Sequence, residues 1–99
     1  MAGITDLDVI EIRKLFEEAL VRAPQTDKRQ KMRLRKKIRD EVFFLLTWEK
    51  PTPASIMNRW EERLQDAFKV MPFGFKEELF KMLMDKMQHP LRLRPAKQK

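Results

Sequence analysis

The sequence lacks cysteine and tyrosine altogether, and it contains only one histidine, one serine and two glycines. Without cysteine there is neither a disulfide framework nor a thiolate metal site. His89 alone cannot build a histidine-based metal centre, and two isolated glycines cannot form a glycine-rich phosphate loop. We therefore expect a protein that is not an enzyme, that holds no metal or cofactor, and that has no small-molecule substrate.

Long hydrophobic runs are absent as well. The longest uninterrupted apolar run extends from Val42 to Leu46, far short of the roughly 20 residues that a membrane-spanning helix needs. The first residues have no basic stretch followed by an apolar one, and Asp6 and Asp8 are unusual for a transit peptide. We expect an intracellular protein, nuclear or cytoplasmic, with no membrane span.

The chain does contain four segments rich in helix-forming residues, separated by proline and glycine. The separating residues are Pro24, Pro51, Pro53, Pro72, Gly74 and Pro90. Apolar side chains recur at helical spacing within each segment, and no segment alternates apolar and polar residues as a half-buried strand does. Helices are therefore predicted at 6–23, 27–48, 53–70 and 75–88.

Three of the predicted helices begin with residues that commonly cap a helix. Thr5 with Asp8 resembles a capping box, in which each side chain accepts a hydrogen bond from the backbone N–H of the other residue. Thr26 is the expected N-cap of the second helix. Thr52 followed by Pro53 suits the start of the third, because proline is favoured at the first helical position.

Each predicted helix carries an apolar stripe that needs a partner face, and four such stripes favour one compact bundle. In the last helix the expected core residues are Leu79, Phe80, Leu83 and Met87. The predicted fold class is all-α: a compact four-helix-bundle-like single domain over residues 1–90, followed by a flexible basic tail at 91–99. The order in which the helices pack does not follow from the sequence.

Positive charge is concentrated in the second helix. The chain has 22 lysines and arginines against 15 acidic residues, and residues 28–39 hold eight of those cations without a single acid. The eight are Lys28, Arg29, Lys31, Arg33, Arg35, Lys36, Lys37 and Arg39. The tail at 91–99 holds four more, so these twelve cations exceed the net charge of +7 and the remainder of the chain is mildly acidic.

This charge pattern favours a non-enzymatic regulatory protein that binds nucleic acid through the basic face of its second helix. Lysine and arginine neutralise phosphates and release counterions without reading bases. RNA is favoured over duplex DNA, because no helix-turn-helix spacing is evident and arginine-rich segments are common in RNA recognition. With the apolar stripe turned inward, the candidate nucleic-acid-binding residues that point outward are Arg29, Arg33, Lys36 and Lys37. Arg35 and Arg39 are candidates nearer the edges of the stripe.

Other interpretations of the same features remain open. The basic run also fits a nuclear-import signal, a solvated face or a docking site for an acidic protein. The alternative function is a protein–protein interaction adaptor, monomeric or homodimeric, that uses the apolar surface of the second and fourth helices. Its candidate interaction residues are Phe43, Phe44, Met82 and Met84. Attachment to an anionic membrane surface is disfavoured, because the apolar stripe of the second helix is needed for the core.

Overall fold

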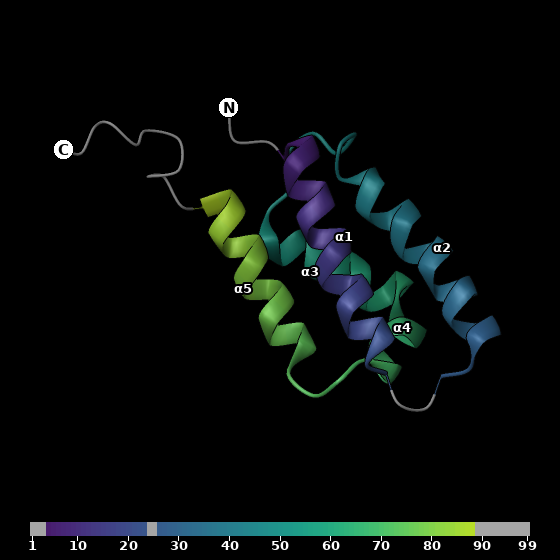
Figure 1. Ribbon diagram of the computed structural model, residues 1–99. Coiled ribbons are helices and arrows are strands. Elements are labelled where there is room, and N and C mark those ends of the chain that lie inside the picture. The colour runs from purple at the N-terminus through teal and green to yellow at the C-terminus, as the bar shows by residue number, and fades with distance from the viewer. Residues whose placement is uncertain (1–3, 24–25, 89–99) are drawn as a thin grey trace.

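The computed structural model describes residues 4–23 and 26–88, and every regular element in those two ranges is a helix. The helices are α1 (Asp6–Val21), α2 (Lys28–Phe44), α3 (Pro53–Arg63), α4 (Gln65–Val70) and α5 (Phe75–Gln88). Together they form a small bundle, which confirms the predicted all-α fold class (Figure 1). The basic tail predicted at 91–99 lies outside the described residues.

The start of α1 is set by the capping box predicted from Thr5 and Asp8. The Thr5 hydroxyl accepts a hydrogen bond from the Asp8 N–H at 3.1 Å, and the Asp8 carboxylate accepts one from the Thr5 N–H at 3.1 Å. A box of the same kind joins Thr52 and Ser55 at the start of α3, where Pro53 occupies the first helical position as predicted. Both caps satisfy backbone donors that a helix start otherwise leaves open.

The start of α2 differs from the prediction. Its N-cap is Asp27, whose carboxylate accepts a hydrogen bond from the Gln30 N–H at 2.8 Å. Thr26 was therefore wrongly predicted as the cap, because its hydroxyl instead donates a hydrogen bond to the Ala23 carbonyl at 3.1 Å. Regular helix ends at Phe44, and tighter hydrogen bonds between residues three apart continue as far as 48.

The third predicted helix, at 53–70, is divided into two helices. Leu64 leaves helical backbone geometry, with φ −115° and ψ 31°, and separates α3 from α4. Leu64 itself remains fully buried at the bend. The bend also accompanies a stacked contact between Phe68 of α4 and Phe16 of α1, whose ring centroids are 6.3 Å apart. No proline or glycine marks the break, so it does not follow from the residues that usually end a helix.

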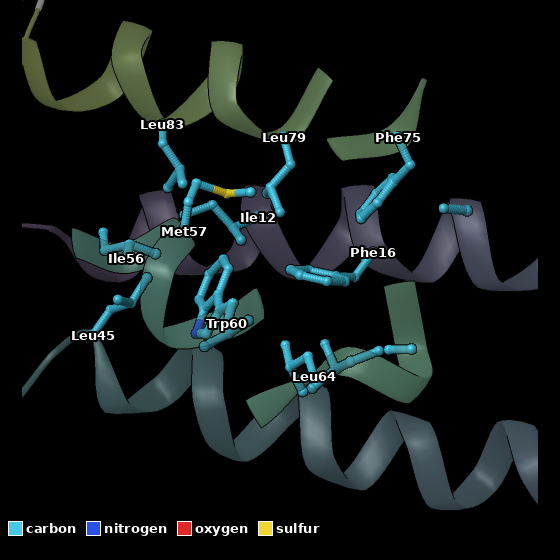
Figure 2. Packing of buried hydrophobic residues seen from close by; sticks show 14 of the residues in the cluster. Ile12, Phe16, Leu45, Ile56, Met57, Trp60, Leu64, Phe75, Leu79 and Leu83 are labelled. Carbon is cyan, nitrogen blue, oxygen red and sulfur yellow. The ribbon is translucent and has the colours of Figure 1, made fainter. Parts of the chain in front are cut away.

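The core is centred on Phe16 of α1. Its ring meets Trp60 of α3 edge-on at a centroid distance of 5.4 Å, and Phe75 of α5 at 5.2 Å. Figure 2 shows Leu79 and Leu83 of α5 closing one side of this cluster. Because all five helices contribute buried side chains to it, the helices share a single hydrophobic core.

The buried stripe of α5 lies slightly differently from the expected one. It consists of Phe75, Leu79 and Leu83, which are spaced four residues apart. Phe80, predicted to be a core residue, is 39% exposed because the stripe is rotated toward Phe75 at the start of the helix. Met87 is partly buried and packs against the core.

In the bundle, α1 lies between α2 and α5 and contacts both of them (Figure 1). α3 packs against α5, and α4 packs against α2. α2 runs antiparallel to α1 and forms one outer edge of the bundle. Only one stripe of α2 is buried, so the opposite side of this basic helix remains open.

Candidate nucleic-acid interface

The predicted basic run occupies the first turns of α2. The buried side chains of this helix are Leu34, Ile38 and Val42, so residues 28–33 contribute none. The first turn of α2 contains no acidic residue. Cations near a helix N-terminus face the positive end of the helix dipole, which costs stability rather than adding to it. Folding alone therefore does not explain the concentration of positive charge here.

Three of the predicted binding residues form the outer face of α2: Arg29, Arg33 and Lys36. All three are exposed, and none forms a hydrogen bond or ion pair within the described ranges 4–23 and 26–88. They stand on successive turns at i, i+4 and i+7, so their charges extend over roughly 10 Å of helix. The outer face is a short row of cations that form no ion pair within these ranges, although the charge of Arg33 also helps to lower the pKa of Asp66 in α4.

Arg35, by contrast, is held by α1. Its Nε and one terminal nitrogen donate to the two carboxylate oxygens of Glu17 at 2.8 and 2.6 Å. The hydrogen bond from Arg35 is the main cause that lowers the pKa of Glu17, and the nearby charges of Arg13 and Lys31 lower it further. The same hydrogen bond raises the pKa of Arg35. The pair occupies two of the five N–H donors of the guanidinium and neutralises its charge, so Arg35 attracts a phosphate less strongly than an arginine without an ion pair.

Lys37 and Arg39 also have carboxylate neighbours. Lys37 reaches α4, where its Nζ donates to both oxygens of Asp66 at 3.2 and 3.1 Å. This hydrogen bond is the main cause that lowers the pKa of Asp66. Arg39 lies 3.7 Å from the carboxylate of the adjacent Asp40, which is a looser pairing. The protein itself therefore partly neutralises both charges, that of Lys37 on the side facing α4 and that of Arg39 beside the groove with α1.

Sequence reasoning missed two further cations close to this surface, Arg13 and Lys14 of α1. They line a groove between α1 and α2 together with Lys36 and Arg39. The guanidinium carbon of Arg13 also lies 5.3 Å from the ring centroid of Phe43. The two residues are an adjacent basic pair in the sequence, but their place beside α2 depends on which helices pack together.

The residues proposed for a protein partner do not gather on one surface. Phe43 and Phe44 of α2 are both exposed, and the guanidinium carbon of Arg59 lies over the Phe44 ring, 3.9 Å from its centroid. On α5, Met84 is exposed and Met82 packs partly against the core. Because α2 and α5 flank α1 on opposite sides (Figure 1), these pairs lie at separate edges of the bundle.

Chemically, the outer face offers guanidinium and ammonium groups, which neutralise phosphates and donate hydrogen bonds to them. Among residues 4–23 and 26–88, no three histidine, cysteine, aspartate or glutamate side chains converge as metal ligands. Within the same ranges, no helix has both the length and the apolar character needed to cross a membrane.

No family model matches the sequence, and no curated protein or solved structure matches it significantly.

Proposed function

We propose that this protein is a non-enzymatic regulatory protein that binds nucleic acid, with RNA favoured over DNA, through the outer face of α2. The observation that carries the proposal is a contrast within one helix. Arg35 and Lys37 donate hydrogen bonds to carboxylates of neighbouring helices, whereas the three cations of the outer face form no ion pair within the described ranges. Unmatched cations on successive turns suit a row of phosphates. A nuclear or cytoplasmic location belongs to the same proposal.

The surroundings of α2 favour contact along a phosphate backbone over insertion into a DNA groove. A helix with its side chains is already about 10–12 Å wide, close to the roughly 12 Å width of the major groove. α1 and α4 pack directly on α2 and would have to enter with it. A single-stranded or looped RNA can follow the open side of α2 without this obstacle.

Base stacking is not part of the proposed contact. The basic run at 28–39 contains no aromatic residue, and aromatic platforms are what sequence-tolerant single-strand binders use to stack bases. The proposed contact is therefore with phosphates, and it should depend strongly on salt. If the three outer-face cations each engage one phosphate, the slope of log Kobs against log salt is about −2, at roughly 0.7 per phosphate of a single strand.

The test is fluorescence anisotropy with a labelled single-stranded RNA. The outer-face variant carries Arg29→Glu, Arg33→Glu and Lys36→Glu, and it should lose most of the affinity. The matched control reverses three exposed cations on other parts of the chain, namely Lys50, Arg63 and Lys81. Because both variants change the net charge equally, the control should keep most of the binding. Equal losses in the two variants, or a wild-type salt slope near zero, would contradict the proposal.

A further inference from the structure

The groove between α1 and α2 has features that phosphate binding does not explain. Its volume is about 750 Å³, and the buried side chains of Phe16 and Ile38 lie among its lining residues. Its walls also carry two large apolar side chains, Ile10 and Met32, which are 58% and 63% exposed. Apolar side chains gathered at a concave surface are typical of a site that another molecule covers.

Cations lie between the two apolar side chains along this groove. The unmatched or loosely matched ones are Arg13, Lys14, Lys36 and Arg39. The charge of Arg35, which also lines the groove, is matched by Glu17. That ion pair marks one level of the two antiparallel helices (Figure 1). Counting from it at about 1.5 Å per residue, Ile10 and Met32 lie roughly 15 Å apart along the groove, with the four cations between them.

We infer that this groove docks an acidic amphipathic α-helix of a partner protein. Two packed antiparallel helices present no strand edge, so a helix lying in the groove is the peptide-binding mode that fits. Roughly 15 Å corresponds to about three helical turns. The partner helix therefore carries an apolar stripe of about three turns to reach both Ile10 and Met32, with carboxylates on its flanks to meet the cations.

Charge and shape argue against the other occupants. The positive rim disfavours a basic segment such as residues 91–99 of this chain, which hold four cations and no acid. A concave site between two helices suits a cylinder better than a flat bilayer surface. Nucleic acid would match the cations but would leave Ile10 and Met32 without an apolar partner. The inference therefore goes beyond the proposed function, because it assigns the groove, which shares Lys36 with the outer face of α2, to a different class of ligand.

The first test uses the full chain and two labelled synthetic peptides of identical composition. One peptide has leucine at i, i+3, i+7 and i+10, with glutamate on both flanks of that stripe; the other has the same residues in an order without a stripe. In fluorescence anisotropy the striped peptide should bind at least about fivefold more tightly, because only it can bury its leucines in the groove. Equal affinities would overturn the inference, since charge alone would then explain the binding.

Variants of the chain then separate apolar contacts from charge. Ile10→Ser and Met32→Ser leave the net charge unchanged and lie at exposed positions, so circular dichroism should show an intact fold. Each should weaken binding of the striped peptide by about three- to tenfold. Phe73→Ser is the matched control, because Phe73 is fully exposed and does not line this groove. Unchanged affinity in both groove variants would overturn the inference.

A labelled single-stranded RNA supplies the remaining comparison. Its affinity should not change in Ile10→Ser or Met32→Ser, because the phosphate contacts are assigned to the outer face of α2. If those variants weaken RNA binding but not peptide binding, the groove belongs to nucleic acid and the partner-helix inference is overturned. If the striped peptide requires the groove while RNA binds nowhere, the inference stands and the proposed function fails.

Discussion

The two halves of α2 differ in how many contacts they make with the rest of the bundle. Residues 28–33 carry four cations and bury no side chain. Residues 34–44 supply the three buried side chains of the helix, and their ion pairs reach α1, α4 and α3. The second half therefore attaches α2 to the bundle, while the first half presents charge that the fold does not use. Mutations that affect stability should consequently map to the second half, and mutations that affect binding should map to the first half and to Lys36, the outer-face cation of the second half.

The largest expected effect is on stability, in the second half. Leu34 is fully buried, whereas Met32, two residues earlier, is mostly exposed. Leu34→Ala should lower the free energy of unfolding by about 2–5 kcal/mol, because it removes buried methyl groups and leaves a cavity. Met32→Ala should stay within about 0.5 kcal/mol of wild type. Urea unfolding measures both, and similar losses would show that the boundary between the halves is misplaced.

A smaller effect is expected where Arg59 of α3 holds the end of α2. Arg59 donates to both oxygens of Glu41 at 2.7 and 3.3 Å, and its guanidinium lies over the ring of Phe44. The Arg59 and Glu41 side chains are only 24% and 13% exposed. Arg59→Lys keeps the charge but loses the bidentate geometry and the stacking on Phe44. The free energy of unfolding should therefore fall by about 1–2 kcal/mol.

Arg35→Lys is the matched control for that substitution. Arg35 makes a bidentate pair of the same kind with Glu17, but both side chains are nearly half exposed. Exposed pairs contribute about 0.2–1 kcal/mol, so this variant should lose less stability than Arg59→Lys in the same urea unfolding experiment. If the two substitutions cost the same, partial burial does not strengthen the Arg59 pair.

For RNA binding, neutralising one cation at a time compares a cation without an ion pair with one that the protein itself pairs. Arg33 forms no hydrogen bond or ion pair with a carboxylate of the described ranges, and it acts on Asp66 only through its charge, whereas Arg35 forms a bidentate pair with Glu17. Arg33→Gln should reduce the steepness of the salt dependence of RNA binding by about 0.7, the contribution of one phosphate of a single strand. Arg35→Gln should leave the slope unchanged. A loss of slope in Arg35→Gln as large as in Arg33→Gln would mean that ion pairing within the protein does not decide which cations bind RNA.

The features of the fold that could be predicted from the sequence are local ones. Thr5 and Asp8 cap each other within a single turn, and Pro53 suits the first position of α3 wherever that helix packs. The break at Leu64 could not be predicted in this way. It accompanies the contact of Phe68 with Phe16, two residues that lie far apart in the sequence, and no local residue preference encodes it.

The same distinction applies to the candidate site. The outward direction of Arg29, Arg33 and Lys36 follows from the helical period once the apolar stripe faces inward. The partners of Arg35 and Lys37 do not follow from it, because Glu17 and Asp66 are 18 and 29 residues away and belong to other helices. Which cations remain unmatched therefore depends on the packing order of the helices, which the sequence pattern leaves undetermined.

A modest gain in stability is expected from changing the first residue of α2. Lys28 faces the positive end of the helix dipole in a turn without acidic residues. Lys28→Glu should raise the free energy of unfolding by about 0.3–1 kcal/mol at low salt, and added salt should shrink the gain. Lys50→Glu, outside the helices, should have a smaller effect in the same thermal and urea unfolding measurements. A loss of stability in Lys28→Glu would contradict the view that this charge is unfavourable for folding.

The smallest expected effect is the loss of stability at low pH, where the ion pairs of the second half are broken. Hydrogen bonds from Arg35 and Lys37 lower the pKa values of Glu17 and Asp66 in the folded protein. Their contribution to stability is therefore fully present above the ordinary carboxylate pKa of about 4, and it is lost as the pH falls through the lowered values. Both pairs are about half exposed, so each contributes less than about 1 kcal/mol.

The double variant Glu17→Gln/Asp66→Asn removes both carboxylates and should be slightly less stable than wild type near neutral pH. The difference should disappear in strong acid, because wild type then carries two neutral groups as well. Urea unfolding over a range of pH measures the difference. A difference that persists in acid would mean that Glu17 and Asp66 stabilise the bundle by packing rather than by charge. The cations of the second half would then be no better matched than those of the first, and the contrast between the halves of α2 would rest on burial alone.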